Sequence, residues 1–127
     1  MNIGVLGGTF DPPHDAHLRI AERSIDQFSL DKVIFIPSGN PWQKKDATSY
    51  RHRYEMTKIL IGDSNDLEIS DIENSEEKPS YTYETLKKLN HPKEELYFIL
   101  GSDAAINIKT WKNYELLENL TNFLIAL

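Results

Sequence analysis

Short apolar runs alternate along this chain with longer amphipathic segments. The apolar runs predict five strands, at Ile3 to Leu6, Val33 to Ile36, Leu67 to Ile72, Leu96 to Leu100 and Phe123 to Leu127. The second, fourth and fifth runs are almost continuously apolar, which is typical of parallel strands that are covered on both faces.

Helical spacing of apolar residues fills the intervals between these strands. Apolar residues recur at that spacing from Leu18 to Phe28, and Asp15 is placed to cap this helix. Three further helices are predicted at Tyr54 to Ile61, Tyr83 to Leu89 and Tyr114 to Leu120. The order of elements predicts an α/β fold, a doubly wound open parallel sheet with helices on both faces. Sheets of this kind bind ligands outside the carboxyl ends of their strands.

Length, charge and composition narrow the class of protein. At 127 residues the chain predicts a single domain, residues 1–127. The net charge of -6 argues against a protein that binds bulk nucleic acid or an anionic membrane. The chain has no cysteine, which excludes disulfides, thiolate catalysis and cysteine-bound metals. No window reaches the apolar length of a membrane span, so we expect a cytoplasmic protein.

Several polar features are predicted to lie on the surface without a further role. The acidic stretch ENSEEKPS, from Glu73 to Ser80, is predicted to be a solvated loop. His52 and His91 stand outside any motif and are likewise predicted to be surface residues.

The stretch GGTFDPPHDAH, from Gly7 to His17, places unusual backbone chemistry directly after the first strand. Gly7 and Gly8 permit positive φ and close approach of the backbone to a ligand. Successive N–H groups in such a turn form an anion site, which the N-terminus of the following helix reinforces. The pattern matches neither the G-x-G-x-x-G dinucleotide motif nor a P-loop. A plain tight turn is the alternative interpretation.

His14 and His17 lie at the start of the helix that follows this turn. Side chains in a first helical turn lean back toward the N-terminus, so both rings can face the pocket formed by the turn. Two imidazoles beside an anion site are suited to stabilising charge on a phosphate during its transfer. Helix capping or ordinary surface histidines are the structural alternatives. A zinc site is a poorer interpretation, because two ligands are too few.

Together these residues resemble the G-x-F-D-P-x-H-x-G-H motif of the nucleotidyltransferase superfamily, whose domain is Rossmann-like. The resemblance implies that His14 and His17 stabilise the transition state at the α-phosphate of a nucleoside triphosphate. The residues implied to contact ATP in this segment are Gly7, Gly8, Thr9, Phe10, His14 and His17. Ala16 stands where the family has a glycine, and its methyl group would narrow the space for the nucleotide base.

The later segments PSGNPWQKK, SYTYETLKKL and GSDAAINIKTWKNYELL resemble bacterial nicotinate-nucleotide adenylyltransferases, and the resemblance extends over essentially the whole chain. It implies that Thr82 hydrogen-bonds the nicotinate carboxylate, that Trp111 stacks near the pyridine ring and that Lys44 lies near the substrate phosphate. Gly101 and Asp103 are implied to bind ribose hydroxyls of ATP. Core packing of Trp111, solvent exposure of Lys44 and helix capping by Thr82 or Asp103 are the structural alternatives.

The activity implied by this resemblance is adenylyl transfer from ATP to nicotinate mononucleotide, with release of pyrophosphate and with Mg²⁺ bound to ATP. Trp42 and Gln43 replace a proline and a histidine that are common in the family. The family's C-terminal phosphate-binding motif has no counterpart before Leu127, so we expect the C-terminal part to be missing. The alternatives are a nucleotidyltransferase acting on phosphopantetheine or glycerol phosphate, a nucleotide-binding module without catalysis, and a purely structural domain.

Overall fold

The computed structural model describes residues 1–39, 48–74 and 81–126, apart from the side chain of Asp103. Within them, strands and helices alternate along the chain as the sequence predicts. In chain order the elements are β1 (Ile3–Gly8), α1 (Asp15–Phe28), β2 (Lys32–Pro37), α2 (Tyr50–Ile61), β3 (Leu67–Ile69), α3 (Thr82–Leu89), the 3₁₀ turn η1 (Lys93–Glu95), β4 (Leu96–Gly101), α4 (Ser102–Asn107), η2 (Ile108–Thr110), α5 (Tyr114–Leu117) and β5 (Asn122–Ala126).

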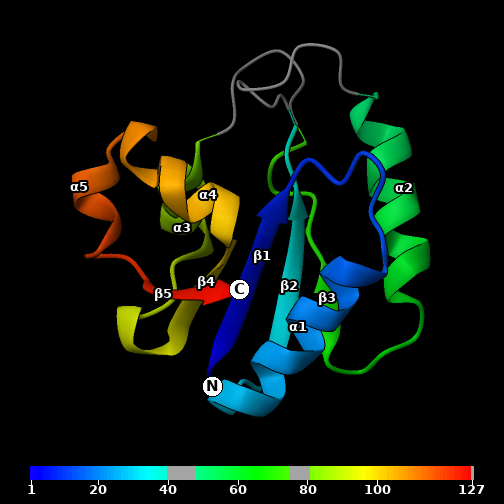
Figure 1. The fold of residues 1–127 in the computed structure, drawn as a ribbon, viewed down its shortest axis with the longest axis horizontal. Coiled ribbons are helices and arrows are strands. Elements are labelled where there is room, and N and C mark those ends of the chain that lie inside the picture. Colours follow the sequence, from blue (N-terminus) through cyan, green and yellow to red (C-terminus); the bar gives the residue numbers. More distant parts are fainter. Residues whose placement is uncertain (40–47, 75–80, 127) are drawn as a thin grey trace.

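The five strands form one parallel sheet in the order β3-β2-β1-β4-β5. β1 lies at the centre, between β2 and β4 (Figure 1). The chain runs outward from β1 to β3 on one side and from β4 to β5 on the other. The strand order therefore reverses between β1 and β4, and sheets of this kind form a ligand crevice at that point.

The helices cover both faces of the sheet, so the predicted doubly wound α/β fold is confirmed. Residues that alternate along each strand point to opposite faces. On one face Val5, Ile34 and Phe98 pack with α3, α4 and α5. On the other, Leu6 and Phe35 pack with α1 and α2. Figure 1 shows the two groups of helices on either side of the sheet.

The first helix begins with a different cap from the one that the sequence suggests. Asp15 is the first residue of α1, and His14 occupies the N-cap with an extended backbone. The His14 imidazole accepts a hydrogen bond from the Ala16 amide, which is the interaction expected of Asp, Asn or Ser at this position. The prediction of Asp15 as the cap is therefore wrong.

Three other boundaries and one additional helix differ from the prediction for physical reasons. α2 begins at Tyr50 instead of Tyr54, because its buried face includes the polar side chains of Arg53 and Thr57 and escapes a search for apolar spacing. β3 ends at Ile69, where Ser70 turns the chain and its hydroxyl accepts a hydrogen bond from a following amide. α5 ends at Leu117, and α4 was not predicted because it has only six residues.

The fifth strand is less covered than its apolar sequence suggests. Among the described residues β5 pairs with β4 alone and lies at the edge of the sheet. Ile125 is 55% exposed, so the prediction of cover on both faces is wrong for β5. No helix in the described part of the chain is long and apolar enough to cross a membrane.

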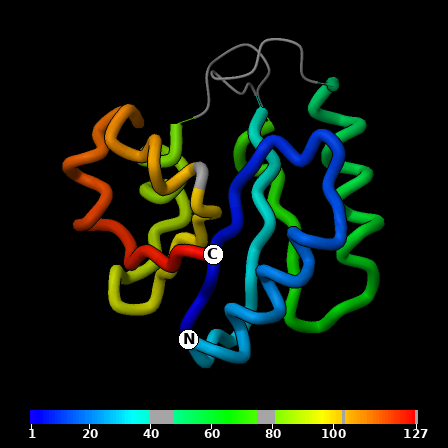
Figure 2. Tube along the Cα trace, viewed as in Figure 1, coloured from blue at the N-terminus to red at the C-terminus, as the bar shows by residue number. Residues whose placement is uncertain are grey.

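The segment that follows β1 takes a path that matters for the site. After Gly8 the chain turns toward the N-terminal end of α2 before it enters α1 (Figure 2). Phe10 lies in this segment with a positive φ of 51°, and its ring is buried against Phe35 and His17. The predicted positive φ thus falls on Phe10, while Gly7 and Gly8 remain in the extended strand β1.

Candidate active site

A cavity of about 920 Å³ opens at the carboxyl ends of β1 and β4. This volume lies at the upper end of the range typical of small-molecule sites, roughly 300–1,000 Å³. Its floor consists of apolar residues from the ends of the central strands, and its walls carry the polar groups. The polar and glycine lining residues are Gly7, Gly8, Thr9, His17, Ser38, Glu73, Tyr81, Thr82, Thr85, Gly101, Trp111 and Lys112.

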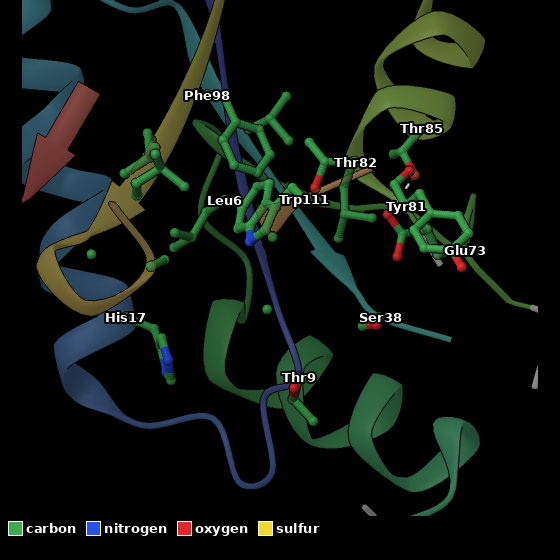
Figure 3. Close-up of a pocket in the computed structure, with 18 of the residues that line it drawn as sticks. Leu6, Thr9, His17, Ser38, Glu73, Tyr81, Thr82, Thr85, Phe98 and Trp111 are labelled. Carbon is green, nitrogen blue, oxygen red and sulfur yellow. Dashed lines mark hydrogen bonds between the residues drawn. The ribbon is translucent and has the colours of Figure 1, made fainter. Parts of the chain in front are cut away.

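The first wall consists of the end of β1, the turn that follows it and the start of α1 (Figure 3). Gly7 and Gly8 line the cavity with their backbone. Cβ atoms at these positions would meet protein only at ordinary contact distances of 3.7 and 3.6 Å. The protein interior therefore leaves room for side chains here, and their absence keeps the main chain accessible from the cavity.

The two histidines form a reciprocal cap at the start of α1. The Ala16 amide donates to Nδ1 of His14 at 3.3 Å, and the His14 amide donates to Nδ1 of His17 at 3.1 Å. The ring centroids lie 4.2 Å apart. Because both Nδ1 atoms accept hydrogen bonds, each neutral ring carries its proton on Nε2. Within the part of the chain that the structure describes, neither Nε2–H group has a hydrogen-bond acceptor, so each can donate to a ligand.

Only His17 of this pair lines the cavity. Its ring packs edge-on against Phe10, with centroids 4.9 Å apart, and this contact fixes the ring beside the turn. His14 is exposed, and its ring lies next to that of His17 at a tilt of 36°. Capping and a role at the cavity are therefore compatible, because Nδ1 serves the helix while Nε2 remains free for a ligand.

His17 is expected to stay neutral at lower pH than an ordinary histidine. Burial lowers the pKa of His17 below its ordinary value of 6.5, and the charge of His14 lowers it further. The folded state then binds fewer protons than the unfolded state, so the stability associated with neutral His17 is present above pH 6.5 and is lost as the pH falls through the lowered pKa. An NMR titration of the His17 ring measures its pKa directly.

His17→Gln supplies the control, because glutamine can still accept the hydrogen bond from the His14 amide but does not titrate. As the pH falls from 7 to 5, the unfolding free energy of the unaltered chain should decrease relative to that of His17→Gln. A titration midpoint at or above 6.5 for His17 would contradict this prediction.

The opposite wall is built from α3, the segment after β3 and the turn before α5. The indole of Trp111 stands edge-on against Phe98 of β4, with ring centroids 6.0 Å apart. Thr85 donates a hydrogen bond to Oε2 of Glu73 at 2.5 Å, which ties α3 to the segment after β3. The Nζ of Lys112 lies 4.7 Å above the ring of Tyr81. Figure 3 shows Trp111 and Thr82 facing the cavity from this side.

The third part of the rim is the junction of β4 and α4. Gly101 lines the cavity and caps α4, and a Cβ atom there would meet no protein atom within 4 Å. Asp103 is in the first turn of α4, but its side chain is outside the described part of the structure. Lys44, Trp42 and Gln43 also lie outside the described residues.

The structure thus brings together seven of the predicted site residues around one cavity, while His14 and Phe10 do not line it. Those that line it are Gly7, Gly8, Thr9, His17, Thr82, Gly101 and Trp111, and Ala16 lies between the two histidines at the start of α1. Trp111 is half-buried and combines packing on Phe98 with a face toward the cavity.

Sequence reasoning missed several lining residues. Glu73 was predicted to begin a solvated acidic loop, but it lines the cavity and accepts the hydrogen bond from Thr85, so that prediction is wrong for this residue. Tyr81 and Lys112 are adjacent in sequence to the predicted residues Thr82 and Trp111, and this adjacency was the signal that could have identified them. Ser38 directly follows β2, and sheets of this kind bind ligands outside the carboxyl ends of their strands.

Metal-binding side chains are not clustered here. Among residues 1–39, 48–74 and 81–126, no three His, Asp or Glu side chains come together as a set of metal ligands.

Comparison with known proteins gives concordant matches. Residues 5–126 match the family model described as cytidylyltransferase-like. A probable nicotinate-nucleotide adenylyltransferase of Desulfatibacillum aliphaticivorans is 46% identical over 127 residues, covering 98% of this chain and 59% of the relative. One of Geotalea daltonii is 43% identical over 130 residues, covering 99% and 60%. The chain thus spans about three fifths of the length of these curated relatives.

Solved structures show the same likeness in three dimensions. Nicotinic acid mononucleotide adenylyltransferase of Plasmodium falciparum, complexed with NaAD, matches with a TM-score of 0.83 and 28% sequence identity. The match covers 98% of this chain and 63% of that one. The same enzyme complexed with APC matches with a TM-score of 0.78 and 27% identity, covering 98% and 62%.

Proposed function

Because the chain belongs to the cytidylyltransferase-like family, we propose that it provides the nucleotidyltransferase domain of a nicotinate-nucleotide adenylyltransferase, an enzyme of NAD biosynthesis. The reaction is adenylyl transfer from ATP to nicotinate mononucleotide, giving nicotinate adenine dinucleotide and pyrophosphate. The observation that carries the proposal is a single cavity with a glycine turn and His17 on one wall and Trp111 with Thr82 on the other.

The two walls differ in chemistry in the way that the two substrates require. On the α1 side, main-chain groups of Gly7 and Gly8, the start of a helix and the Nε2–H of His17 suit a triphosphate. On the α3 side, Trp111 offers an aromatic surface for a pyridine ring and Thr82 offers a hydroxyl for its carboxylate. We assign ATP to the first side and nicotinate mononucleotide to the second.

The remaining assignments follow this division. Thr9 and Phe10 are assigned to the ATP phosphates. Gly101 and Asp103, at the junction of β4 and α4, are assigned to the ribose of ATP. Lys44 is assigned to the substrate phosphate from its place in the sequence. His14 is assigned to the phosphates through its own Nε2–H group.

Among the charged groups on the α3 side, Lys112 favours nicotinate over nicotinamide, although its ammonium group also lies 4.0 Å from the carboxylate of Glu84. Lys112 lines the cavity next to Trp111, so its ammonium group can approach a carboxylate on a ring stacked there. Glu73 also lines this side, where its carboxylate accepts the hydrogen bond from Thr85. A carboxylate therefore gains a charge-assisted contact with Lys112 that a carboxamide lacks.

The reaction needs no nucleophile from the protein. An oxygen of the 5′-phosphate of nicotinate mononucleotide bonds to the α-phosphorus of ATP, and the bond from that phosphorus to the leaving pyrophosphate breaks in line. The protein holds two anions in contact and places N–H donors where negative charge accumulates. Neutral His17 donates from Nε2 to the reacting phosphate. Mg²⁺ bound to the triphosphate would supply further neutralisation of charge.

The chain with ATP and nicotinate mononucleotide is expected to release pyrophosphate in a coupled phosphate assay. Nicotinamide mononucleotide should react about tenfold or more slowly, because one hydrogen bond to a charged group contributes about 1.5–3 kcal/mol. Phosphopantetheine and glycerol phosphate should give no release above background. Faster reaction with either of these would identify another transferase of the superfamily, and binding of both nucleotides without release would identify a nucleotide-binding module.

A further inference from the structure

Arg53 is a buried arginine that the assignments above do not use. It lies in the first turn of α2, is 1% exposed, and has the largest side chain among the fully buried residues described. Burying a guanidinium is costly unless its N–H groups are hydrogen-bonded. The partners that compensate this cost therefore indicate what the residue holds in place.

The guanidinium joins the ends of two central strands to the start of α2. Its Nη1 donates to the carbonyl oxygen of Thr9 at 2.9 Å and to that of Ser38 at 2.6 Å. Nη2 donates to Gly39 at 3.2 Å, and Nε donates to Thr48 at 2.7 Å. The planar fork of donors suits such a set of fixed carbonyls, and a lysine could not reproduce it.

Two of these carbonyls belong to residues that line the cavity. Thr9 and Ser38 are lining residues, whereas Arg53 is not. The guanidinium therefore turns the Thr9 and Ser38 carbonyl oxygens away from the cavity. Carbonyl oxygens that faced a phosphate would repel it, so their withdrawal favours an anion.

The same hydrogen bonds fix the N–H groups of the following residues. In a trans peptide the carbonyl oxygen and the amide hydrogen point in opposite directions. When the Thr9 carbonyl points to Arg53, the Phe10 N–H points away from Arg53. Within residues 1–39, 48–74 and 81–126, the Phe10 N–H has no hydrogen-bond acceptor. The Gly39 N–H is directed in the same way by the Ser38 carbonyl.

Other contacts also fix the turn that follows β1. The Thr48 amide donates to Oδ2 of Asp11 at 2.7 Å, and the Ser38 amide donates to the Gly8 carbonyl at 2.8 Å. Phe10 has a φ of 51°, a conformation that a bulky residue keeps only when its surroundings impose it. Arg53 is part of those surroundings.

We propose that Arg53 is a positioning residue, which withdraws the Thr9 and Ser38 carbonyls and thereby presents the Phe10 and Gly39 amides to a phosphate group bound in the cavity. The proposal rests on the proposed function to the extent that it requires a phosphate-bearing ligand at this turn. It acts through the backbone, because Arg53 itself does not reach the cavity.

Two variants of Arg53 test this role with inorganic pyrophosphate and ATP as probes. Arg53→Lys keeps the charge but loses the fork of donors, and Arg53→Met removes both. Calorimetry should show that each variant binds pyrophosphate about tenfold or more weakly than the unaltered chain, as expected for the loss of about one charged hydrogen bond. In ¹H–¹⁵N spectra, the Phe10 amide should shift on addition of pyrophosphate in the unaltered chain and much less in Arg53→Lys.

Thr57→Val is the matched control. Thr57 is fully buried one turn along α2, and its hydroxyl donates to the Arg53 main-chain carbonyl at 2.8 Å, so the variant perturbs the same helix without touching the guanidinium. It should bind pyrophosphate as the unaltered chain does, at a folded fraction matched by circular dichroism. If Arg53→Met does not fold, the comparison of pyrophosphate binding by Arg53→Lys and by the unaltered chain tests the inference.

Three results would each overturn the inference. They are equally weakened pyrophosphate binding in Thr57→Val, unchanged pyrophosphate binding in Arg53→Lys, and a Phe10 amide signal that pyrophosphate does not shift. So would a failure of the unaltered chain to bind pyrophosphate. If the unaltered chain binds pyrophosphate with the expected Phe10 shift but does not release it from ATP and nicotinate mononucleotide, the proposed function fails and the inference about Arg53 stands.

Discussion

His17→Ala is expected to lower kcat for adenylyl transfer about a hundredfold to a thousandfold, the usual effect of removing one preorganised donor to a transition state. The KM for ATP should change little. The reason lies in the geometry: the His14 amide engages Nδ1 of His17, the Phe10 ring fixes the imidazole edge-on, and Nε2–H is left as the donor at the cavity. Steady-state kinetics with both substrates measure the two parameters separately.

His14→Ala is the informative comparison for this prediction. It removes the cap of α1, so it should lower stability by about 1 kcal/mol, and it also removes the second Nε2–H group. Turnover should fall here as well, but less than in His17→Ala, because His14 is exposed and does not line the cavity, whereas His17 does.

The ratio of the two effects on kcat and KM decides the role of His17. A variant that loses kcat and ATP affinity equally has lost a group that binds the ground state and the transition state alike. That outcome in His17→Ala would contradict a role confined to the transition state. An unaltered chain without turnover would instead contradict the proposed function, and direct binding of ATP would then show whether the nucleotide site remains.

The sequence predicts the architecture of this site better than its detailed contacts. Alternating apolar runs identify all five strands, and the rule on strand ends places a ligand at the switch between β1 and β4, where the cavity lies. The residues that resemble family motifs, including His17, Thr82 and Trp111, lie around that cavity because each belongs to the connection that leaves the carboxyl end of a strand. Order along the chain is enough to bring them together.

The residues that the sequence does not reveal are polar groups with distant partners. Arg53 looks like an ordinary charged position on a helix, and only the folded chain brings it to the carbonyls of Thr9 and Ser38. Glu73 sits at the start of an acidic stretch, and its contact with Thr85 depends on how α3 returns to the sheet. Neither hydrogen-bond pattern leaves a periodic trace in the sequence.

Trp111→Ala is expected to raise the KM for nicotinate mononucleotide about tenfold to a hundredfold, since stacking on an aromatic side chain contributes about 1–3 kcal/mol. The KM for ATP should change far less, because Trp111 lies on the α3 side of the cavity, opposite the glycine turn. Trp111→Phe keeps an aromatic face and should recover most of the affinity. Kinetics with each substrate varied in turn provide the measurement.

The control for Trp111→Ala must reproduce its cost to packing without touching the ligand. Trp111 and Phe123 both stand edge-on against Phe98, at centroid distances of 6.0 and 6.4 Å, but only Trp111 lines the cavity. Phe123→Ala therefore removes a comparable contact from the same ring and should leave the KM for nicotinate mononucleotide near that of the unaltered chain. If both variants raise this KM alike, Trp111 acts by supporting Phe98 and the core. If Trp111→Ala alone raises it, the indole is the platform on which the pyridine ring stacks.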